Sequence, residues 1–371
     1  MRYYIIAGEA SGDLHGGNLI KALHAQDAHA EVRCWGGDRM QAAGAELVKH
    51  YRDLAFMGFV EVIRHLPTIL RNISFCKQDI LQWKPDVLVL IDYPGFNMRI
   101  AEWAHVQEIK VVYYISPQVW AWKENRVKKL KRDVDRMLVI LPFEVDFYHK
   151  WHFPVTYVGH PLIEVVAEEK SKPVAAPLSP KPIIALLPGS RVQEIRLKLP
   201  VMLQMTAHFP DYEFVIAQAP SQPDSIYNEI IGNRKVKMVK GQTYELLKQA
   251  SAALVTSGTA TLETALFGVP EVVCYKGNQL SYWLAKRLIK VKYISLVNLI
   301  MDNPVIRELI QHDLNEASLK ASLERLLNDD NYKQQIAADY RELWHKLGDT
   351  PASATAAKEI FALISAAGAR P

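Results

Sequence analysis

The chain has 371 residues, of which 49% are apolar and 23% charged, and its formal net charge is +4. This composition excludes disordered, collagen-like and disulfide-stabilised proteins, because the chain can bury a core and its 3 cysteines lie far apart. The mild charge gives no argument for nucleic-acid binding, and no apolar run approaches the ~20 residues that span a bilayer. The first residues lack a secretory signal, so we expect a cytoplasmic protein.

Short β-branched runs alternate with amphipathic segments along the chain. The first series of runs covers residues 3–7, 32–35, 87–91, 111–115, 137–140 and 155–158. The alternation then restarts at residues 183–187, 214–217, 236–239, 252–256 and 272–275. This pattern predicts an α/β protein with two doubly wound, Rossmann-like domains facing a cleft. After Asn298 the pattern is almost entirely helical, with a break at Pro351 before a final helix.

A linker separates the two series, because four prolines fall within residues 167–182 and few large apolar groups do. The predicted domains are residues 1–168 and 183–345, joined by a linker at 169–182. A C-terminal helix is predicted within residues 346–371. The sequence leaves open whether this helix packs on the first domain or exchanges with a partner chain.

Two strand ends in the first domain carry candidate functional loops. The segment GEASGD at residues 8–13 allows a tight turn, and Ser11 or Asp13 could cap the helix that follows. Asp92 ends a fully apolar strand, where a carboxylate can act as a general base. Each feature also has a structural interpretation, as an ordinary strand–helix turn or a turn-forming aspartate.

Two strand ends in the second domain suggest a site for a phosphorylated ligand. In LPGSR at residues 187–191, Arg191 could grip a diphosphate. The small residues at 257–259 open a helix whose free N–H groups suit a phosphate, and Glu263 could bind ribose hydroxyls. The structural interpretations are a surface arginine at a turn and a capping motif with Ser257 or Thr259 as the cap.

Three further segments have both a ligand-binding and a structural interpretation. The loop at 116–122 carries Trp120 and Trp122, which could stack on a sugar or pack within the loop. Residues 123–136 contain seven Lys or Arg and three acidic residues. This basic run could be a lipid-binding patch or a solvated helix face. The apolar stretch 56–70 fits a membrane surface or a core stripe. No Cys or His cluster has the spacing of a metal site.

Together the motifs resemble the lipid-A-disaccharide synthase family of inverting GT-B glycosyltransferases. The resemblance runs from Met1 to about Gln311 and is carried, in order, by residues 8–13, 91–97, 116–122, 158–162, 187–195, 257–263 and 293–298. The chain departs from the family pattern at residues 93–95 and at Val297, where the family usually has proline before Asn298.

The resemblance implies a specific reaction. The donor would be UDP-2,3-diacylglucosamine and the acceptor 2,3-diacylglucosamine 1-phosphate (lipid X). The products would be the β-1,6-linked lipid A disaccharide 1-phosphate and UDP, formed with inversion and without a metal or other cofactor. The protein would be peripherally associated with the anionic surface of the inner membrane, on its cytoplasmic side, and would bind no nucleic acid. A homodimer is a further expectation.

The resemblance also assigns residues to roles. Asp92 is the expected catalytic base. The residues expected at the sugars of the substrates are Glu9, Ser11, Gly12, Asn97 and Trp120. The residues expected at the nucleotide are Ser190, Arg191, Ser257, Gly258, Thr259, Glu263 and Asn298. The stretch 56–70 and the run 123–136 would serve acyl chains and anionic lipid.

Two rival functions fit part of these observations. A UDP-sugar 2-epimerase of the same fold would keep the nucleotide motifs of the second domain. It would not need the tryptophan loop, the basic run or the apolar stretch. A non-catalytic lipid- or nucleotide-binding protein predicts that Asp92→Ala leaves function intact.

Overall fold

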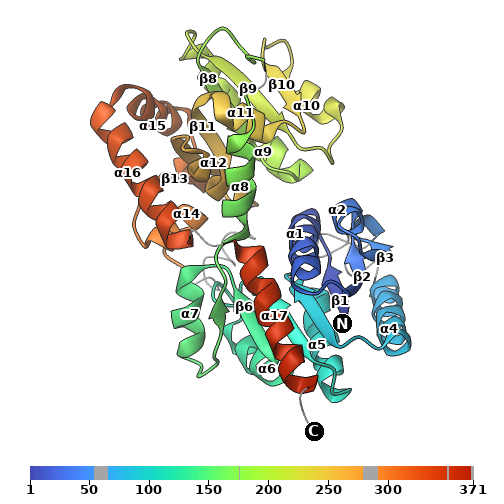
Figure 1. Ribbon diagram of the computed structural model, residues 1–371. Helices are drawn as coiled ribbons and strands as arrows, with labels where there is room; N and C mark the ends of the chain where they lie inside the picture. Colours follow the sequence, from blue (N-terminus) through green and yellow to red (C-terminus); the bar gives the residue numbers. More distant parts are fainter. Residues whose placement is uncertain (54–65, 175, 279–290, 349–350, 369–371) are drawn as a thin grey trace. The chain divides into compact units, whose positions relative to one another are not determined.

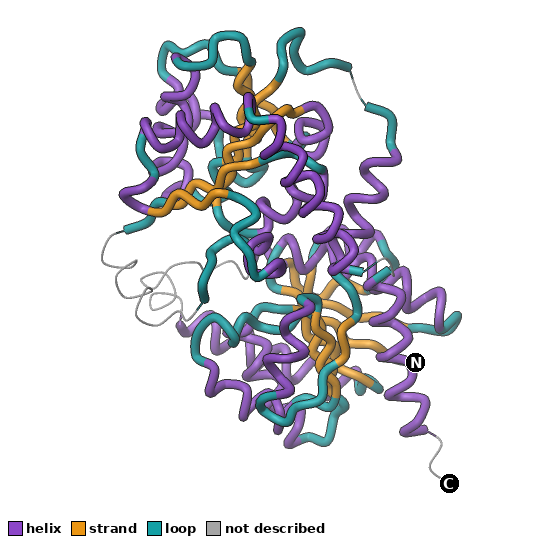
Figure 2. The backbone as a smooth tube through the Cα atoms, turned by 90° about the vertical axis from the view of Figure 1, so that its left-hand side faces the viewer, coloured by secondary structure: helices purple, strands orange, loops and turns teal. Residues whose placement is uncertain are grey.

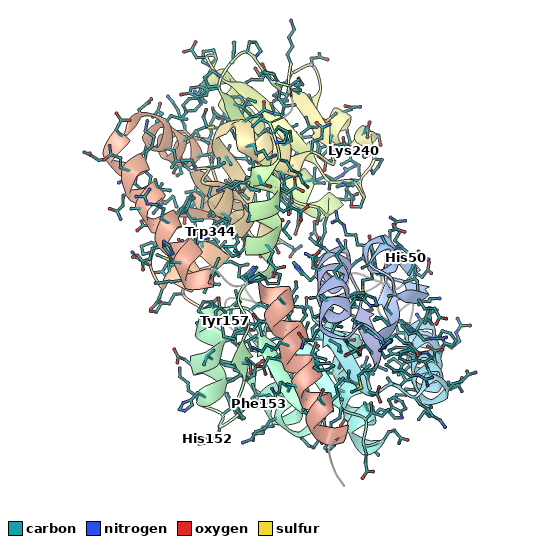
Figure 3. All side chains as sticks on the ribbon, viewed as in Figure 1. His50, His152, Phe153, Tyr157, Lys240 and Trp344 are labelled. Carbon is teal, nitrogen blue, oxygen red and sulfur yellow. The ribbon has the colours of Figure 1, made fainter. Side chains whose placement is uncertain are left out.

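The computed structural model describes residues 1–53, 66–174, 176–278, 291–348 and 351–368 (Figure 1). Contacts divide the chain into two units, Met1–Pro161 with Asp349–Pro371, and Leu162–Gly348. The helix α8 (Pro161–Ser171) therefore begins at the division, ahead of the predicted linker at 169–182. Its Lys170 Nζ donates to the carbonyl of Leu266 and lies 5.3 Å from the ring centroid of Trp344, labelled in Figure 3. These contacts tie α8 to the second unit.

The first unit is built on a seven-stranded sheet in which every pair of neighbouring strands is parallel, in the order β3-β2-β1-β4-β5-β6-β7. Its strands are β1 (Arg2–Ala7), β2 (Glu31–Gly36), β3 (Glu46–His50), β4 (Val87–Ile91), β5 (Val111–Tyr114), β6 (Arg136–Val139) and β7 (Thr156–Tyr157). Its helices are α1 (Ala10–Gln26), α2 (Asp38–Ala42), α4 (Leu66–Trp83), α5 (Pro94–Val106), α6 (Val127–Asp133), α7 (Pro142–His149) and α17 (Ala352–Gly368), with the 3₁₀ turns η1 (Tyr51–Asp53) and η2 (Glu124–Arg126). Central strands β4 and β5 are buried along their whole length, as their apolar sequences predicted.

The last helix belongs to the first unit although the second unit precedes it in the chain. It packs along α1, and Figure 1 shows the two side by side. Residues at a spacing of four, Ala352, Ala356, Ile360 and Ile364, are buried on one face. Glu359 adds an ion pair to Arg136 at the start of β6. In this structure of a single chain the helix packs on the first unit, and exchange with a partner chain stays an open prediction.

The second unit has a six-stranded parallel sheet in the order β10-β9-β8-β11-β12-β13. Its strands are β8 (Ile183–Leu187), β9 (Glu213–Gln218), β10 (Lys237–Lys240), β11 (Ala250–Thr256), β12 (Glu271–Tyr275) and β13 (Arg307–Ile310). Its other helices are α9 (Val192–Gln204), α10 (Asp224–Ile231), α11 (Thr243–Gln249), α12 (Thr259–Phe267), α14 (Leu296–Met301), α15 (Glu316–Asn328) and α16 (Asp330–Leu347), with the 3₁₀ turns η3 (Met205–Ala207) and η4 (Gln311–Asp313). Figure 2 shows helices on both sides of the strands.

The sequence analysis did not predict two strands, β3 and β13. Both β3 and β13 are edge strands, each paired with a single neighbour. The prediction of an almost entirely helical chain after Asn298 is wrong at β13. The sequence RELI there mixes polar and apolar residues, because an edge strand is only partly buried and needs no continuous apolar run.

The strand order fixes where a ligand would bind in each unit. The first strand of each unit lies inside its sheet, and the order reverses between β1 and β4 and between β8 and β11. Ligands of open parallel sheets bind beyond the carboxyl ends of the strands at such a reversal. The loops that follow these four strands are those that the sequence analysis selected. Among the described residues, no helix has the length and apolar character to cross a bilayer.

Candidate functional site

Asp92 begins a strained turn directly after β4. Asp92 has a φ of 44° and Tyr93 a φ of 47°, so two consecutive non-glycine residues are left-handed. The side-chain amide of Asn97 donates to the carbonyls of Ile91 (3.1 Å) and Asp92 (2.8 Å). The hydroxyl of Tyr113 donates to the same Asp92 carbonyl at 2.6 Å. Such strain persists only where surrounding contacts impose it, and here those contacts fix the direction of the Asp92 side chain.

The surroundings of Asp92 suit it to accept a proton near neutral pH. Burial raises the pKa of this carboxyl to about 6, and the negative charge of Glu9 adds to the effect. Glu9 precedes α1 and makes no side-chain capping hydrogen bond there. A general base is most effective when its pKa lies close to the working pH. The geometry therefore places one carboxylate as a candidate base and a second as its electrostatic neighbour.

The GEASGD loop is arranged differently from its capping interpretation. Neither Ser11 nor Asp13 caps α1, because the carboxylate of Asp13 accepts the N–H groups of Arg39 (3.2 Å) and Met40 (3.1 Å) at the start of α2. Ser11 is exposed beside Glu9. The loop thus ties α1 to α2 through Asp13 and leaves Ser11 accessible.

Gly12 and Asn97 have packing and positioning roles in this structure. A Cβ on Gly12 would lie 3.0 Å from the Cβ of Ala7, so glycine lets α1 approach β1 closely. Asn97 is fully buried, with its amide on the backbone carbonyls of the Asp92 turn. The structure therefore brings the carboxylates of Glu9 and Asp92 into electrostatic interaction, leaves Ser11 exposed, and buries Gly12 and Asn97. Sequence reasoning could not separate these groups, since burial depends on packing.

The tryptophan loop has one half-buried and one exposed ring. Trp120 packs edge-on against Phe143, with centroids 4.9 Å apart. Near this loop the buried carboxylate of Glu144 accepts the N–H groups of Ile140 (3.2 Å) and Leu141 (2.9 Å), and burial raises its pKa to about 7. Trp122 is 44% exposed, with Lys123 Nζ 4.5 Å and Arg126 Cζ 5.5 Å from its ring centroid.

Much of the basic run 123–136 is neutralised within the first unit. Glu102 pairs with Lys129 (3.5 Å) and with Arg132 (2.9 Å), and Arg136 pairs with Glu359. Of the remaining cations, Lys123 and Arg126 lie at the ring of Trp122, whereas Lys131 donates to the carbonyl of Trp151. In the apolar stretch 56–70, residues 56–65 lie outside the described part of the chain. Beyond them α4 exposes Leu70 (55%) and Phe75 (47%).

A pocket of about 450 Å³ lies at the reversal point of the second sheet. Loops after β8, β9 and β11 line it, together with the first turn of α12. The lining includes Gly189, Ser190, Arg191, Thr256, Ser257, Gly258, Thr259 and Glu263. Six of the seven residues expected at the nucleotide therefore meet in one cavity.

The start of α12 forms one wall of this pocket. Gly258 has a φ of 140°, a conformation that favours glycine, and no side chain caps the helix. The hydroxyl of Ser257 donates instead to the carbonyl of Ile294 at 2.9 Å, so the capping interpretation of this motif is wrong. The uncapped N–H groups and the helix dipole make this wall suitable for a phosphate.

Arg191 stands at the rim of the same pocket. Its side chain is 63% exposed, and its guanidinium lies 3.9 Å from Glu194. Glu194 accepts the N–H of Ser190 at 3.3 Å. A Cβ on Gly189 would lie 2.4 Å from that carboxylate, and Gly189 has a φ of 115°. Glycine therefore permits a tight loop from which Arg191 can reach a bound anion.

Glu263 and Asn298 end up in different places. Glu263 lines the pocket, where Tyr244 donates to it at 2.7 Å and burial raises its pKa. Asn298 is buried outside the lining of this pocket, donating to Ile306 (2.9 Å) and Glu308 (3.0 Å). Its amide joins α14 to β13, so the structure does not bring it to the pocket lined by the other six residues.

Sequence reasoning missed two groups that shape this region. Glu308 accepts the backbone N–H groups of Ile294 and Ser295 and so fixes the segment that receives Ser257. Lys198 is buried on α9 and contacts Thr256. Its spacing of three from Ile195 placed it in the apolar stripe of the helix, which was the available signal. Within the described residues, no group of three or more His, Cys, Asp or Glu could hold a metal ion.

Solved structures with a similar fold include glycosyltransferases and UDP-sugar epimerases. A UDP-GlcNAc 2-epimerase from Neisseria meningitidis has a TM-score of 0.69 at 12% identity, with 99% of this chain and 100% of that chain covered. The S. aureus MnaA–UDP structure has a TM-score of 0.68 at 13% identity, with 100% of this chain and 98% of that chain covered. The calicheamicin glycosyltransferase CalG4 has a TM-score of 0.61 at 18% identity, with 98% of each chain covered. At these identities the likeness shows the fold alone, which is the predicted GT-B fold.

The sequence comparisons reach further. The family model described as lipid-A-disaccharide synthetase matches residues 3–360. Proteins named lipid-A-disaccharide synthase are similar over most of their length. The relative from Trichlorobacter lovleyi is 37% identical, with 98% of this chain and 97% of the relative covered. The relative from Geobacter sulfurreducens is 39% identical, with 94% of this chain and 93% of the relative covered, and the relative from Coxiella burnetii is 38% identical, with 97% and 98% covered. Because the family match and these relatives span nearly the whole chain, the chain belongs to the lipid-A-disaccharide synthetase family of glycosyltransferases.

Proposed function

We propose that this protein transfers 2,3-diacylglucosamine from UDP-2,3-diacylglucosamine to 2,3-diacylglucosamine 1-phosphate. The products are the β-1,6-linked lipid A disaccharide 1-phosphate and UDP. The family match and the names of the relatives support the reaction class. The observation that carries the proposal is the pocket in which Arg191, an uncapped helix start and a carboxylate meet, as a nucleoside diphosphate requires.

In this proposal the pocket of the second unit binds UDP. Arg191 and the N–H groups at the start of α12 hold the diphosphate, and Glu263 accepts hydrogen bonds from the ribose. Ser190 and Thr259 supply further donors at the pocket wall. These fixed donors stabilise the charge that develops on UDP as it leaves, and one such donor can lower a barrier by ~3 kcal/mol.

Asp92 of the first unit is the proposed base. As the acceptor hydroxyl oxygen forms its bond to the anomeric carbon, its proton passes to the carboxylate of Asp92. The bond between that carbon and the diphosphate oxygen breaks, and its electron pair leaves with UDP. Attack opposite the leaving group inverts the anomeric centre. The raised pKa of Asp92 favours this proton transfer, because a more basic carboxylate takes a hydroxyl proton more readily.

We also propose that the protein works on the anionic surface of the inner membrane, where its acylated substrates reside. The exposed Leu70 and Phe75 of α4 and the group Trp122, Lys123 and Arg126 support this location, because apolar and basic side chains together favour anionic lipid. Sedimentation with vesicles containing an anionic phospholipid checks it, and binding that is equal to neutral vesicles would contradict the basic contribution. A homodimer remains part of the proposal, and light scattering measures it.

The decisive experiment measures UDP release from UDP-2,3-diacylglucosamine in EDTA, with and without 2,3-diacylglucosamine 1-phosphate. Acceptor-dependent release in EDTA supports a metal-independent glycosyltransferase. Turnover of a UDP-sugar without any acceptor would support the epimerase instead. A folded protein that releases no UDP in either mixture would favour a binding protein.

A further inference from the structure

One lysine is buried beneath the nucleotide pocket. Lys198 lies on α9 and is only 2% exposed. Its Nζ donates to the hydroxyl oxygen of Thr256 and lies 5.7 Å from the ring centroid of Tyr275. Lysine is rarely buried unless its charge is paired, because removing an ammonium from water is costly. Its position therefore calls for a physical reason.

No carboxylate lies within ion-pair distance of Lys198 in the described part of the chain. The ionisable groups around it are Glu194 on the same helix, Arg191 at the position before that helix, and Cys274 on β12. Glu194 acts only at longer range and is opposed by Arg191, and burial raises the pKa of the Cys274 thiol to about 12, so that it stays neutral. Burial accordingly lowers the pKa of Lys198 itself. The positive charge is thus incompletely compensated in the ligand-free protein.

Thr256 connects this charge to the pocket. It is the last residue of β11 and lines the cavity beside Ser257 and Gly258. Its hydroxyl oxygen accepts from Lys198, and none of the described residues accepts the hydroxyl hydrogen. A hydroxyl that accepts from an ammonium is polarised and becomes a stronger donor. That hydrogen is available to an anion in the pocket.

We propose that Lys198 is a positioning residue for the nucleotide diphosphate, whose charge it attracts from beneath the pocket and through the Thr256 hydroxyl. The inference deepens the proposed function and rests on it, because it takes UDP as the occupant. The diphosphate supplies the counter-charge that the protein lacks. Lys198 touches no reacting atom and acts through Thr256.

The test compares UDP, UMP and uridine binding by calorimetry in the wild type and in Lys198→Met. Methionine has a similar length and no charge, so the ligand-free variant should have a Tm equal to or above that of the wild type. UDP affinity should fall about 10- to 100-fold, UMP affinity less, and uridine affinity by about twofold at most. Thr256→Val should reproduce the same order of losses, and Thr256→Ser should restore UDP binding.

Arg196→Met is the matched control, because it removes one positive charge from the exposed side of the same helix, where Arg196 pairs with Glu229. The UDP affinity of this control should stay within about twofold of the wild-type affinity. Equal losses for UDP and uridine in Lys198→Met, or unchanged UDP affinity, would overturn the inference. A wild type that binds neither UDP nor uridine would instead overturn the proposed function, and this inference with it.

A second readout follows the proton of Lys198. A bound diphosphate favours the ammonium, so UDP binding should raise the pKa of Lys198 and take up protons at alkaline pH. Uptake should be absent in Lys198→Met and with uridine as ligand. Tyr275→Phe should retain the uptake, since the phenol beside Lys198 also titrates in this range. Equal uptake in the wild type and Lys198→Met would contradict the proposed role.

Discussion

The ring of Tyr93 occupies the space that a side chain on Gly8 would need. A Cβ at position 8 would lie 2.3 Å from the Cγ of Tyr93, well inside van der Waals contact. The same ring stacks on Phe96, with centroids 5.6 Å apart, and so has little freedom to move. Because Tyr93 follows Asp92 in the strained turn, the absence of a side chain at Gly8 helps to hold the candidate base in place.

Gly8→Ala should therefore displace Tyr93 and the Asp92 turn. We expect a loss of about 1–3 kcal/mol in stability from overpacking, and a turnover at least tenfold lower. UDP affinity should be unchanged, because the proposed UDP pocket is lined by residues of the other unit. Gly95→Ala is the control, since a Cβ there meets nothing within 4 Å. Equal effects of the two substitutions on turnover would contradict this account.

Asp92→Asn tests the base directly. The amide keeps the shape of the side chain but cannot accept the proton, so turnover should fall by about 100-fold or more. UDP affinity, measured by calorimetry, should stay within about twofold. A loss in turnover below tenfold would move the role of base to another group, with Glu9 or the buried His15 of α1 as the candidates.

Glu9→Gln should shift the pH dependence of the reaction. Only the deprotonated form of Asp92 accepts a proton, so kcat/KM should rise with pH through the pKa of Asp92, about 6. The negative charge of Glu9 raises this pKa, and removing the charge lowers it. The acidic limb of the profile should therefore move to lower pH in Glu9→Gln. A limb that stays in place would show that Glu9 does not act on the titrating group.

Arg191→Ala should weaken UDP binding about 10- to 100-fold, as expected for the loss of a charge-assisted contact to a diphosphate. Uridine affinity should change little, because the nucleoside carries no phosphate. Arg196→Ala removes an exposed arginine from α9, the helix that follows Arg191, and serves as the control. Unchanged UDP affinity in Arg191→Ala would refute its assignment to the diphosphate.

Glu271 should make stability depend on pH. It is fully buried at the start of β12, and burial raises its pKa well above the ordinary value. Its protonated form is therefore favoured in the folded state. This contribution is complete below the unfolded pKa of ~4.3 and is lost at about 1.4 kcal/mol per pH unit as pH rises toward the folded pKa.

Glu271→Gln should keep its stability as pH rises from about 5 to 8, while the wild type loses stability. Thermal unfolding at several pH values measures the difference. Glu213→Gln changes the same residue type at the start of β9, where the side chain is half-buried, and should leave the wild-type pH dependence in place. Parallel profiles for the wild type and Glu271→Gln would show that Glu271 is ionised in the folded protein.

Most strands and the motifs at their ends could be predicted from the sequence. Parallel strands buried on both faces are continuous apolar stretches, and the loops after them contain glycine. The positions of Asp92, Arg191 and Glu263 at strand ends or in the helix turns that follow them could be predicted for this reason. The edge strands β3 and β13 could not, since their sequences ELVKH and RELI mix polar and apolar residues without a recognisable apolar run. The membership of α17 in the first unit also needed the structure, because its apolar face is compatible with several partners.

Within the site, residue type and position gave the candidates, and only tertiary contacts separated them. Asn97 and Asn298 are polar residues beside good motifs, yet both are buried on backbone groups, while Ser11 and Arg191 are exposed. Lys198 has the appearance of an ordinary helix cation, yet packing puts it under the pocket. The sequence by itself determined the fold class, the family and the strand-end loops that are candidates for the site, because these depend on local pattern. The tertiary structure decided which candidate side chains line a pocket or lie exposed and which are buried, because burial and hydrogen-bond partners are set by segments far apart in the chain.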